Sequence, residues 1–144
     1  MTLRRAASIG LRILLGAVWV YAAYTKLRES WLLFAMSIDA YRMLPQWAVI
    51  TLARSLPWVE LAMGCLMIAG LALRYVSIIA ALTLSGFFCA MLLAHSRGLG
   101  IDCGCFGPGD TLSGWTLLRD GTLLAATFAL VYLSWIGQRR YAAE

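Results

Sequence analysis

The chain has 144 residues, of which 62% are hydrophobic and 13% charged, and its mean hydropathy is +0.79. This composition lies far from that of a soluble domain and predicts a single membrane domain over residues 1–144. The net charge of +5 does not indicate nucleic-acid binding, because the cations lie at the ends of apolar runs and form no basic stripe. No Gly-rich phosphate loop follows a predicted strand, which disfavours nucleotide chemistry.

Four apolar runs approach the length of a transmembrane helix, which needs about 20 mostly apolar residues. They cover residues 6–25, 56–73, 75–94 and 122–137. Residues 29–55 are too polar to span, but their apolar side chains recur at helical spacing until Pro45 interrupts the pattern. We expect an amphipathic interfacial helix there, then a shorter helical piece at 47–54. The predicted fold is an all-α bundle of four transmembrane helices with an interfacial amphipathic segment between helices 1 and 2.

The second and third runs are separated by little more than Arg74, so we expect a tight antiparallel hairpin with Gly64 providing a small surface between them. Cys65 and Cys89 lie in these runs, at depths that differ by only about 5 Å at ~1.5 Å per residue. One interpretation is a second thiol pair that relays electrons inward. The other is that each cysteine is a small buried hydrophobe.

The loop at residues 95–115 contains the remaining cysteines, Cys103 and Cys105, with Gly104 between them. Cysteines one residue apart form a disulfide only if the backbone bends sharply, and glycine provides that freedom. A strained, exposed disulfide is easily reduced and is typical of a catalytic or regulatory pair. The alternative is a structural clip within the loop.

Two ionisable residues, Lys26 and Glu60, fall near the outer ends of the first and second runs. An ionisable group inside a membrane span is a functional-site candidate, and Lys26 is the expected partner of Glu60. The pair would line the outer mouth of the bundle or manage protons during thiol oxidation, or serve as a structural ion pair. Arg119 and Asp120 raise the same question, and we interpret them as interfacial anchors.

Two loop charges, Arg97 and Asp102, flank the cysteine pair. A positive charge from Arg97 would favour a nearby thiolate and lower its pKa, although an ordinary solvated loop charge explains the residue as well. His95 is the only histidine of the chain. It offers a base or a metal ligand, or is simply a polar residue at a helix end.

Five short motifs, taken together and in order, resemble the MauE/DoxX family of redox-associated membrane proteins. They are Tyr-Ala-Ala-Tyr-Thr-Lys-Leu at 21–27, Tyr-Arg-Met-Leu-Pro at 41–45, Pro-Trp-Val-Glu-Leu at 57–61, Asp-Cys-Gly-Cys-Phe-Gly at 102–107 and Leu-Leu-Arg-Asp at 117–120. The resemblance extends over nearly the whole chain. It implies a four-helix bundle that exchanges disulfides outside the cytoplasm with a separate, thioredoxin-like partner protein.

Under this resemblance the chain is a thiol–disulfide oxidoreductase, or the membrane subunit of one, acting through Cys103 and Cys105. A quinone is the implied electron acceptor, for which Trp58 and Tyr24 are candidate contacts, and no metal is assigned. One alternative is a membrane protein that binds a soft ion such as Cu(I) through the loop cysteines and His95. Another is a non-catalytic scaffold for a periplasmic redox enzyme.

The twelve lysines and arginines divide equally between the two sides of the membrane, so their number does not decide the orientation. We therefore take the orientation from the first span, which usually dominates. The N-terminal flank of that span has Arg4, Arg5 and Arg12 and no acid. We therefore expect a multi-pass protein of the cell inner membrane with both termini in the cytoplasm and the Cys-Gly-Cys loop outside.

Overall fold

The computed structural model of the chain describes residues 3–141, with side chains described through residue 136. These residues form the helices α1 (Leu3–Arg28), α2 (Trp31–Ala40), α3 (Gln46–Ala69), α4 (Leu73–Ser96) and α5 (Gly114–Tyr141). Helices α1, α3 and α4 and the Gly114–Ile136 part of α5 are long and apolar enough to cross a membrane. The predicted fold class is confirmed, with α2 as the short helix between the first two spans.

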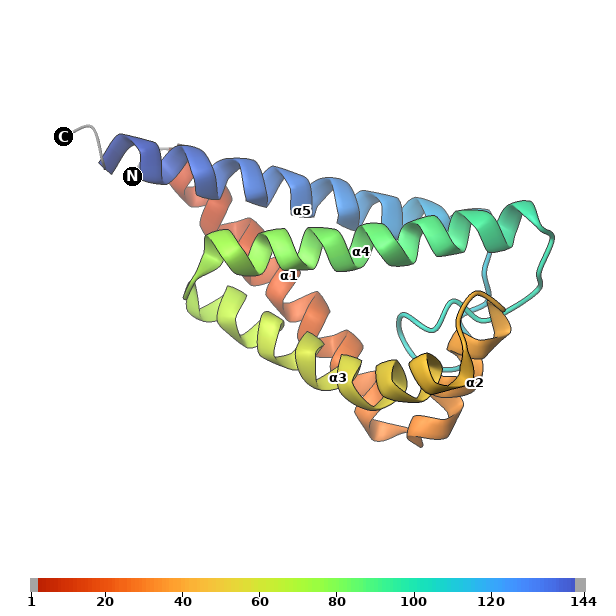
Figure 1. The fold of residues 1–144 in the computed structure, drawn as a ribbon. Coiled ribbons are helices and arrows are strands. Elements are labelled where there is room, and N and C mark those ends of the chain that lie inside the picture. The colour runs from red at the N-terminus through yellow and green to blue at the C-terminus, as the bar shows by residue number, and fades with distance from the viewer. Residues whose placement is uncertain (1–2, 142–144) are drawn as a thin grey trace.

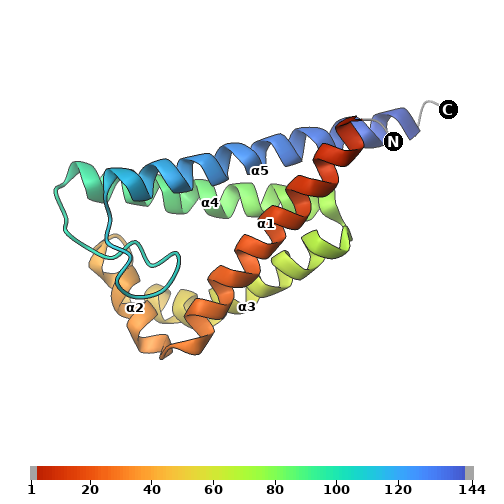
Figure 2. The same ribbon diagram turned by 180° about the vertical axis from the view of Figure 1, so that it is seen from behind.

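The four long helices are arranged as two pairs, α1 with α3 and α4 with α5. The pairs lie close together near the chain termini and diverge toward the opposite end of the molecule (Figures 1 and 2). Helix α2 and the loop between α4 and α5 lie between the diverging pairs. The Cys-Gly-Cys loop is therefore inserted into the open end of the bundle rather than placed on its surface.

Helices α1 and α3 approach closely at two glycines that face one another. A Cβ atom on Gly16 would lie 2.9 Å from the carbonyl oxygen of Gly64, and one on Gly64 would lie 2.8 Å from that of Gly16. Between helices in lipid, small residues allow backbones to approach closely, and packing then stabilises the contact. The prediction that Gly64 lies between the second and third runs is wrong, because it faces α1. Helices α3 and α4 are nevertheless joined by a tight connection at residues 70–72.

Two predicted boundaries are also wrong. Helix α3 is continuous from Gln46, so the separate piece at 47–54 does not exist, and α5 begins at Gly114 rather than near residue 122. Pro57 lies buried inside α3. A proline removes one helical hydrogen bond, but neighbouring helices allow a membrane helix to continue through it. Helix α2 is such a neighbour, because its Phe34 and Ile38 pack on the first half of α3.

The core lies where all four long helices meet, toward the closed end. Its largest buried side chains are Leu15, Trp19, Met63, Met67 and Leu130. A smaller cluster at the open end contains Tyr41, Met91, Ala94 and Cys103. One of the two loop cysteines is thus part of the packed interior.

Candidate functional site

The loop between α4 and α5 is folded back on itself by two backbone hydrogen bonds. Cys103 N donates to Asp110 O over 2.8 Å, and Leu112 N donates to Ile101 O over 2.8 Å. Gly104 adopts a φ of 75°, in the left-handed region that glycine enters without strain. A Cβ there would lie 3.3 Å from Ser37 Cβ, so the glycine also allows the loop to lie against α2.

Both carbonyl groups that flank Gly104 are held by side chains from other helices. Tyr41 Oη, at the end of α2, donates to Cys103 O over 2.8 Å, and Lys26 Nζ, in α1, donates to Cys105 O over 2.9 Å. Burial, with the nearby thiols and carboxylates, raises the pKa of Tyr41, so its hydroxyl stays a donor. The backbone around the cysteine pair is therefore fixed from two sides.

The structure brings Lys26 and Glu60 together. Lys26 Nζ lies 2.8 Å from both Oε1 and Oε2 of Glu60, and the two side chains are only 3% and 5% exposed. With the Cys105 carbonyl as third acceptor, all three N–H donors of the ammonium group are used. The pair joins α1 to α3 and attaches the loop to both.

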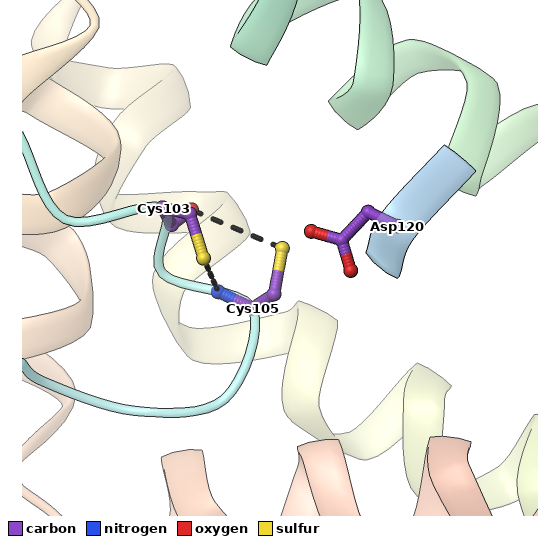
Figure 3. Close-up of side chains that lie close together, drawn as sticks. All are labelled: Cys103, Cys105 and Asp120. Atoms are coloured by element: carbon purple, nitrogen blue, oxygen red, sulfur yellow. Dashed lines mark hydrogen bonds between the residues drawn. The ribbon is translucent and has the colours of Figure 1, made fainter. Parts of the chain in front are cut away.

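Both loop cysteines are free thiols that contact one another (Figure 3). Cys105 N lies 3.4 Å from Cys103 Sγ, and Cys105 Sγ lies 4.0 Å from Cys103 O. Cys103 Sγ also donates to Asp110 Oδ2 over 3.1 Å and lies 3.8 Å from Arg119 Nη2. Cys103 is buried and Cys105 is half-buried.

The two thiols differ in acidity. Hydrogen bonding from Cys105 lowers the pKa of Cys103, although burial and Asp110 act in the opposite direction. The pKa of Cys105 is raised well above its usual value by its hydrogen bond to Cys103 and then by burial. The first proton therefore leaves the pair more readily than the second, and the Cys105 N–H and Arg119 beside Cys103 Sγ favour a negative charge on that sulfur.

Three charged side chains beside the thiols form a cluster that the sequence did not predict. Arg119 Nη2 lies 2.9 Å from Asp110 Oδ2 and 3.2 Å from Asp120 Oδ2, and Arg119 Nε lies 3.2 Å from Asp120 Oδ1. The guanidinium also lies 4.5 Å from the centre of the Phe106 ring. The interpretation of Arg119 and Asp120 as interfacial anchors does not foresee this cluster, because the predicted span begins at residue 122, whereas α5 begins at Gly114 and includes both residues.

Two cavities approach the cysteine pair from different directions. One is small, about 40 Å³, and is lined by Cys105, Lys26, Glu60, Asp120 and apolar residues of α1, α4 and α5. The other is about 430 Å³, lies between α2, α3 and α4, and reaches Cys103 past mainly apolar side chains. Its volume falls in the range of about 300–1,000 Å³ that is usual for small-molecule sites.

A metal ion fits the cysteine pair poorly. Within the described part of the chain, Cys103, Cys105 and Asp120 are the donors that approach one another, to within 4.8 Å. A structural zinc site needs four ligands. The Asp120 carboxylate is already paired with Arg119. The described donors therefore do not complete a tetrahedral zinc site.

The other predicted residues make no hydrogen bond with either thiol in the described part of the chain. Asp102 accepts a hydrogen bond from Gly109 N over 3.1 Å, and Arg97 and His95 are exposed at the end of α4. The guanidinium that reaches Cys103 is thus that of Arg119, not that of Arg97. The candidate quinone contacts Trp58 and Tyr24 are 62% and 56% exposed, and neither lines the two cavities described above.

The cysteines within the spans lie on the outside of the bundle. Cys65 in α3 and Cys89 in α4 are exposed free thiols, so neither is the small buried hydrophobe of the alternative interpretation. A second thiol pair formed by them stays a prediction.

The comparison with known proteins shows the family of this chain. The family described as "Methylamine utilisation protein MauE" matches residues 4–133. The chain is also 33% identical over 117 residues to the "Methylamine utilization protein MauE" of Methylorubrum extorquens, which covers 78% of this chain and 61% of that protein. The chain thus spans about three-fifths of the length of this relative. No solved structure matches the chain. On the family match and this identity, the chain belongs to the MauE family and is a multi-pass membrane protein.

Proposed function

We propose that this chain is a membrane thiol–disulfide oxidoreductase, or the membrane subunit of one, that exchanges disulfides with a thioredoxin-like partner through Cys103 and Cys105. The observation that carries the proposal is the environment of the pair. Two free thiols contact one another, one has a lowered pKa, and Arg119 lies beside it. A guanidinium beside a partly accessible thiol pair is typical of reactive cysteines rather than of structural ones.

The asymmetry of the pair assigns a role to each sulfur. In the oxidised state a partner thiolate attacks Cys105 Sγ, which belongs to the more exposed of the two residues, and Cys103 leaves with the electron pair of the broken S–S bond. A thiol of lower pKa leaves faster, which favours Cys103 as the leaving group. The second partner thiol then attacks the partner sulfur of the mixed disulfide. The partner loses two electrons, and Cys103 and Cys105 gain them.

For the reoxidation of the pair, a quinone is our proposed acceptor. A quinone takes two electrons and two protons from the dithiol and leaves as a hydroquinone, so the disulfide is restored. The cavity of about 430 Å³ between α2, α3 and α4 supports this proposal, because its walls are mainly apolar and it reaches Cys103. Phe34, Phe87 and Tyr41 contribute aromatic side chains to it.

The proposed topology places both termini in the cytoplasm and the cysteine loop outside. The loop lies at the end of the bundle opposite to the described termini (Figure 1). Three arginines, Arg4, Arg5 and Arg12, precede or begin the first span, which favours a cytoplasmic N-terminus. Because the relative from Methylorubrum extorquens is named for methylamine utilisation, we propose that the exchange serves that process.

The proposal is tested by trapping the partner. In membranes, Cys103→Ser keeps Cys105, whose thiol can attack the disulfide of the oxidised partner. The variant lacks the sulfur that would convert the mixed disulfide back to the Cys103–Cys105 disulfide, so a mixed disulfide should accumulate on Cys105. The matched control Cys105→Ser should trap far less. Proteins captured by Cys103→Ser and released by reductant identify the partner.

Three outcomes contradict the proposal. One is a pair whose labelling by a thiol reagent never changes with added reductant or oxidant. Another is a metal ion that copurifies in stoichiometric amount and blocks labelling, which would indicate metal binding instead. The third is a partner that associates equally with the double variant lacking both loop cysteines, which would indicate a scaffold.

A further inference from the structure

Two carboxylates lie beside the two sulfurs. Cys103 Sγ donates to Asp110 Oδ2 over 3.1 Å. A carboxylate oxygen of Asp120 lies within 4.8 Å of the sulfur of Cys105, and Figure 3 shows this carboxylate directed toward that sulfur. Arg119 joins the two carboxylates, at 2.9 Å and 3.2 Å.

The charges of this cluster do not balance. One guanidinium faces two carboxylates, which leaves one negative charge that a proton can neutralise. The neighbouring Lys26 is not available to compensate, because its three donors are used by Glu60 and by the Cys105 carbonyl. Of the other ionisable groups around the loop, Tyr41 donates to the Cys103 carbonyl and Asp102 accepts from Gly109 N.

The two carboxylates differ in their access to water. The side chain of Asp110 is 25% exposed, whereas that of Asp120 is only 2% exposed. Asp120 lines the small cavity that also contains Cys105, Lys26 and Glu60. Protons therefore reach Asp110 from the aqueous surface and Asp120 from inside the cavity.

We propose that Asp110 and Asp120 are the catalytic groups that exchange protons with Cys103 and Cys105, respectively, and that Arg119 holds both in place. This inference rests on the proposed thiol–disulfide exchange and adds its proton carriers. Asp110 and Asp120 are catalytic in the strict sense, because each lies beside a reacting sulfur. Arg119 is a positioning residue for both.

The chemistry balances without an additional reactant. A dithiol that reduces the Cys103–Cys105 disulfide gives up two electrons and two protons and becomes a disulfide. The first attacking thiol passes its proton to Asp120, its sulfur bonds to Cys105 and the S–S bond breaks toward Cys103. The second thiol of the dithiol gives its proton to the Asp110 carboxylate, which passes it to the Cys103 thiolate. Cys105 receives the proton stored on Asp120 when it is released.

The test uses the full chain in lipid nanodiscs and dithiothreitol as the dithiol probe. The variants are Asp110→Asn and Asp120→Asn, which keep the size of the side chain and remove its charge and basicity. Asp102→Asn is the matched control. Asp102 lies in the same loop, and its carboxylate accepts a hydrogen bond from Gly109 N rather than from either thiol. The rate of disulfide reduction and the alkylation rate of each reduced cysteine, scored by mass spectrometry, are measured against pH.

Two results are expected together. Asp120→Asn slows reduction at least about tenfold near pH 7, because it has no base for the attacking thiol, and the difference vanishes near about pH 9, where the probe ionises by itself. Asp110→Asn accelerates alkylation of Cys103 about three- to tenfold near pH 7, because removing a carboxylate lowers the pKa of the thiol. A purely structural aspartate would change the two rates in the same direction at every pH.

Variants whose pH profiles coincide with that of Asp102→Asn would overturn the inference. So would a loss of rate in Asp120→Asn that persists near pH 9, since this would indicate a misfolded site. If the native Cys103–Cys105 pair is reduced and reoxidised normally while all three variants behave alike, only the role of Asp110 and Asp120 as proton carriers is refuted. A native pair that dithiothreitol and oxidant cannot interconvert refutes the proposed function itself.

Discussion

Two groups of charged residues lie at the open end of the bundle, and they are built differently. The Lys26–Glu60 pair is electrically neutral, almost fully buried and hydrogen-bonded at every ammonium donor. The cluster of Asp110, Arg119 and Asp120 has one cation for two carboxylates and is partly exposed at Arg119 and Asp110.

This difference in charge and burial fits a structural role for the neutral pair and the proposed proton exchange for the cluster. A buried pair whose hydrogen bonds are all made holds its geometry in a medium of low dielectric, so Lys26 and Glu60 fix the position of the loop. A cluster with an unbalanced charge beside two thiols can take up and release a proton at little cost.

The largest effect is expected from breaking the neutral pair. Lys26→Met leaves the Glu60 carboxylate buried without a partner, which should lower the free energy of unfolding by about 3–5 kcal/mol. Unfolding by denaturant in detergent micelles measures it. The double variant Lys26→Met with Glu60→Leu should recover most of the loss in global stability. A single variant as stable as the native protein would show that the pair is not a structural clamp.

Removing the shared cation should act on both stability and thiol chemistry. Arg119→Met deprives both carboxylates of charge-assisted hydrogen bonds, with an expected loss of about 1.5–3 kcal/mol. It also raises the pKa of Cys103, because the positive charge that favours the thiolate is gone, so alkylation near neutral pH slows. Arg97→Met, in the exposed position at the end of α4, is the control and should leave the alkylation rate unchanged.

A smaller effect is expected at the hydroxyl group that holds the Cys103 carbonyl. Tyr41→Phe removes one buried hydrogen bond and should cost about 1 kcal/mol. Because the pKa of Tyr41 is raised in the folded protein, its stabilising effect is complete below its usual value of 10.0 and is lost as pH rises toward the folded value. Unfolding measured across alkaline pH should therefore show a steeper decline for the native protein than for Tyr41→Phe.

The smallest effect is expected from the thiols within the spans. Because Cys65 and Cys89 are exposed on the outside of the bundle, Cys65→Ala and Cys89→Ala should each change the free energy of unfolding by less than about 0.5 kcal/mol. The redox cycling of Cys103 and Cys105 should be unchanged in the double variant. Slower reoxidation of the loop pair in that variant would instead support an electron relay through a second thiol pair.

Several features of this protein were readable from local sequence. Hydropathy gave the four spans and the interfacial helix, because a membrane span depends on composition over about 20 residues and little else. The ionisable residues Lys26 and Glu60 were identified as partners, because a charge inside a span needs one. The Cys-Gly-Cys motif was identified from spacing alone.

Other features required knowledge of the helix boundaries. The hydropathy of residues 114–121 is too low to mark a span, so Asp120 was placed at the end of a helix and interpreted as an anchor. Helix α5 in fact begins at Gly114, and its second turn brings Arg119 and Asp120 beside the thiols. Nothing in the local sequence relates Asp110 to Cys103 or Tyr41 to the loop, because these contacts depend on how the loop folds back and on how α2 packs.

The sequence by itself determined that this is a four-span membrane protein with a Cys-Gly-Cys pair in a loop and two ionisable residues near the ends of its spans. Composition and spacing are local properties, and they are sufficient for those conclusions. Only the tertiary structure decided which charge faces which sulfur, because the divergence of the two helix pairs creates the space into which the loop inserts. That insertion brings a carboxylate to each thiol and a guanidinium between the carboxylates, from residues that lie up to 17 positions apart in the chain (120 − 103).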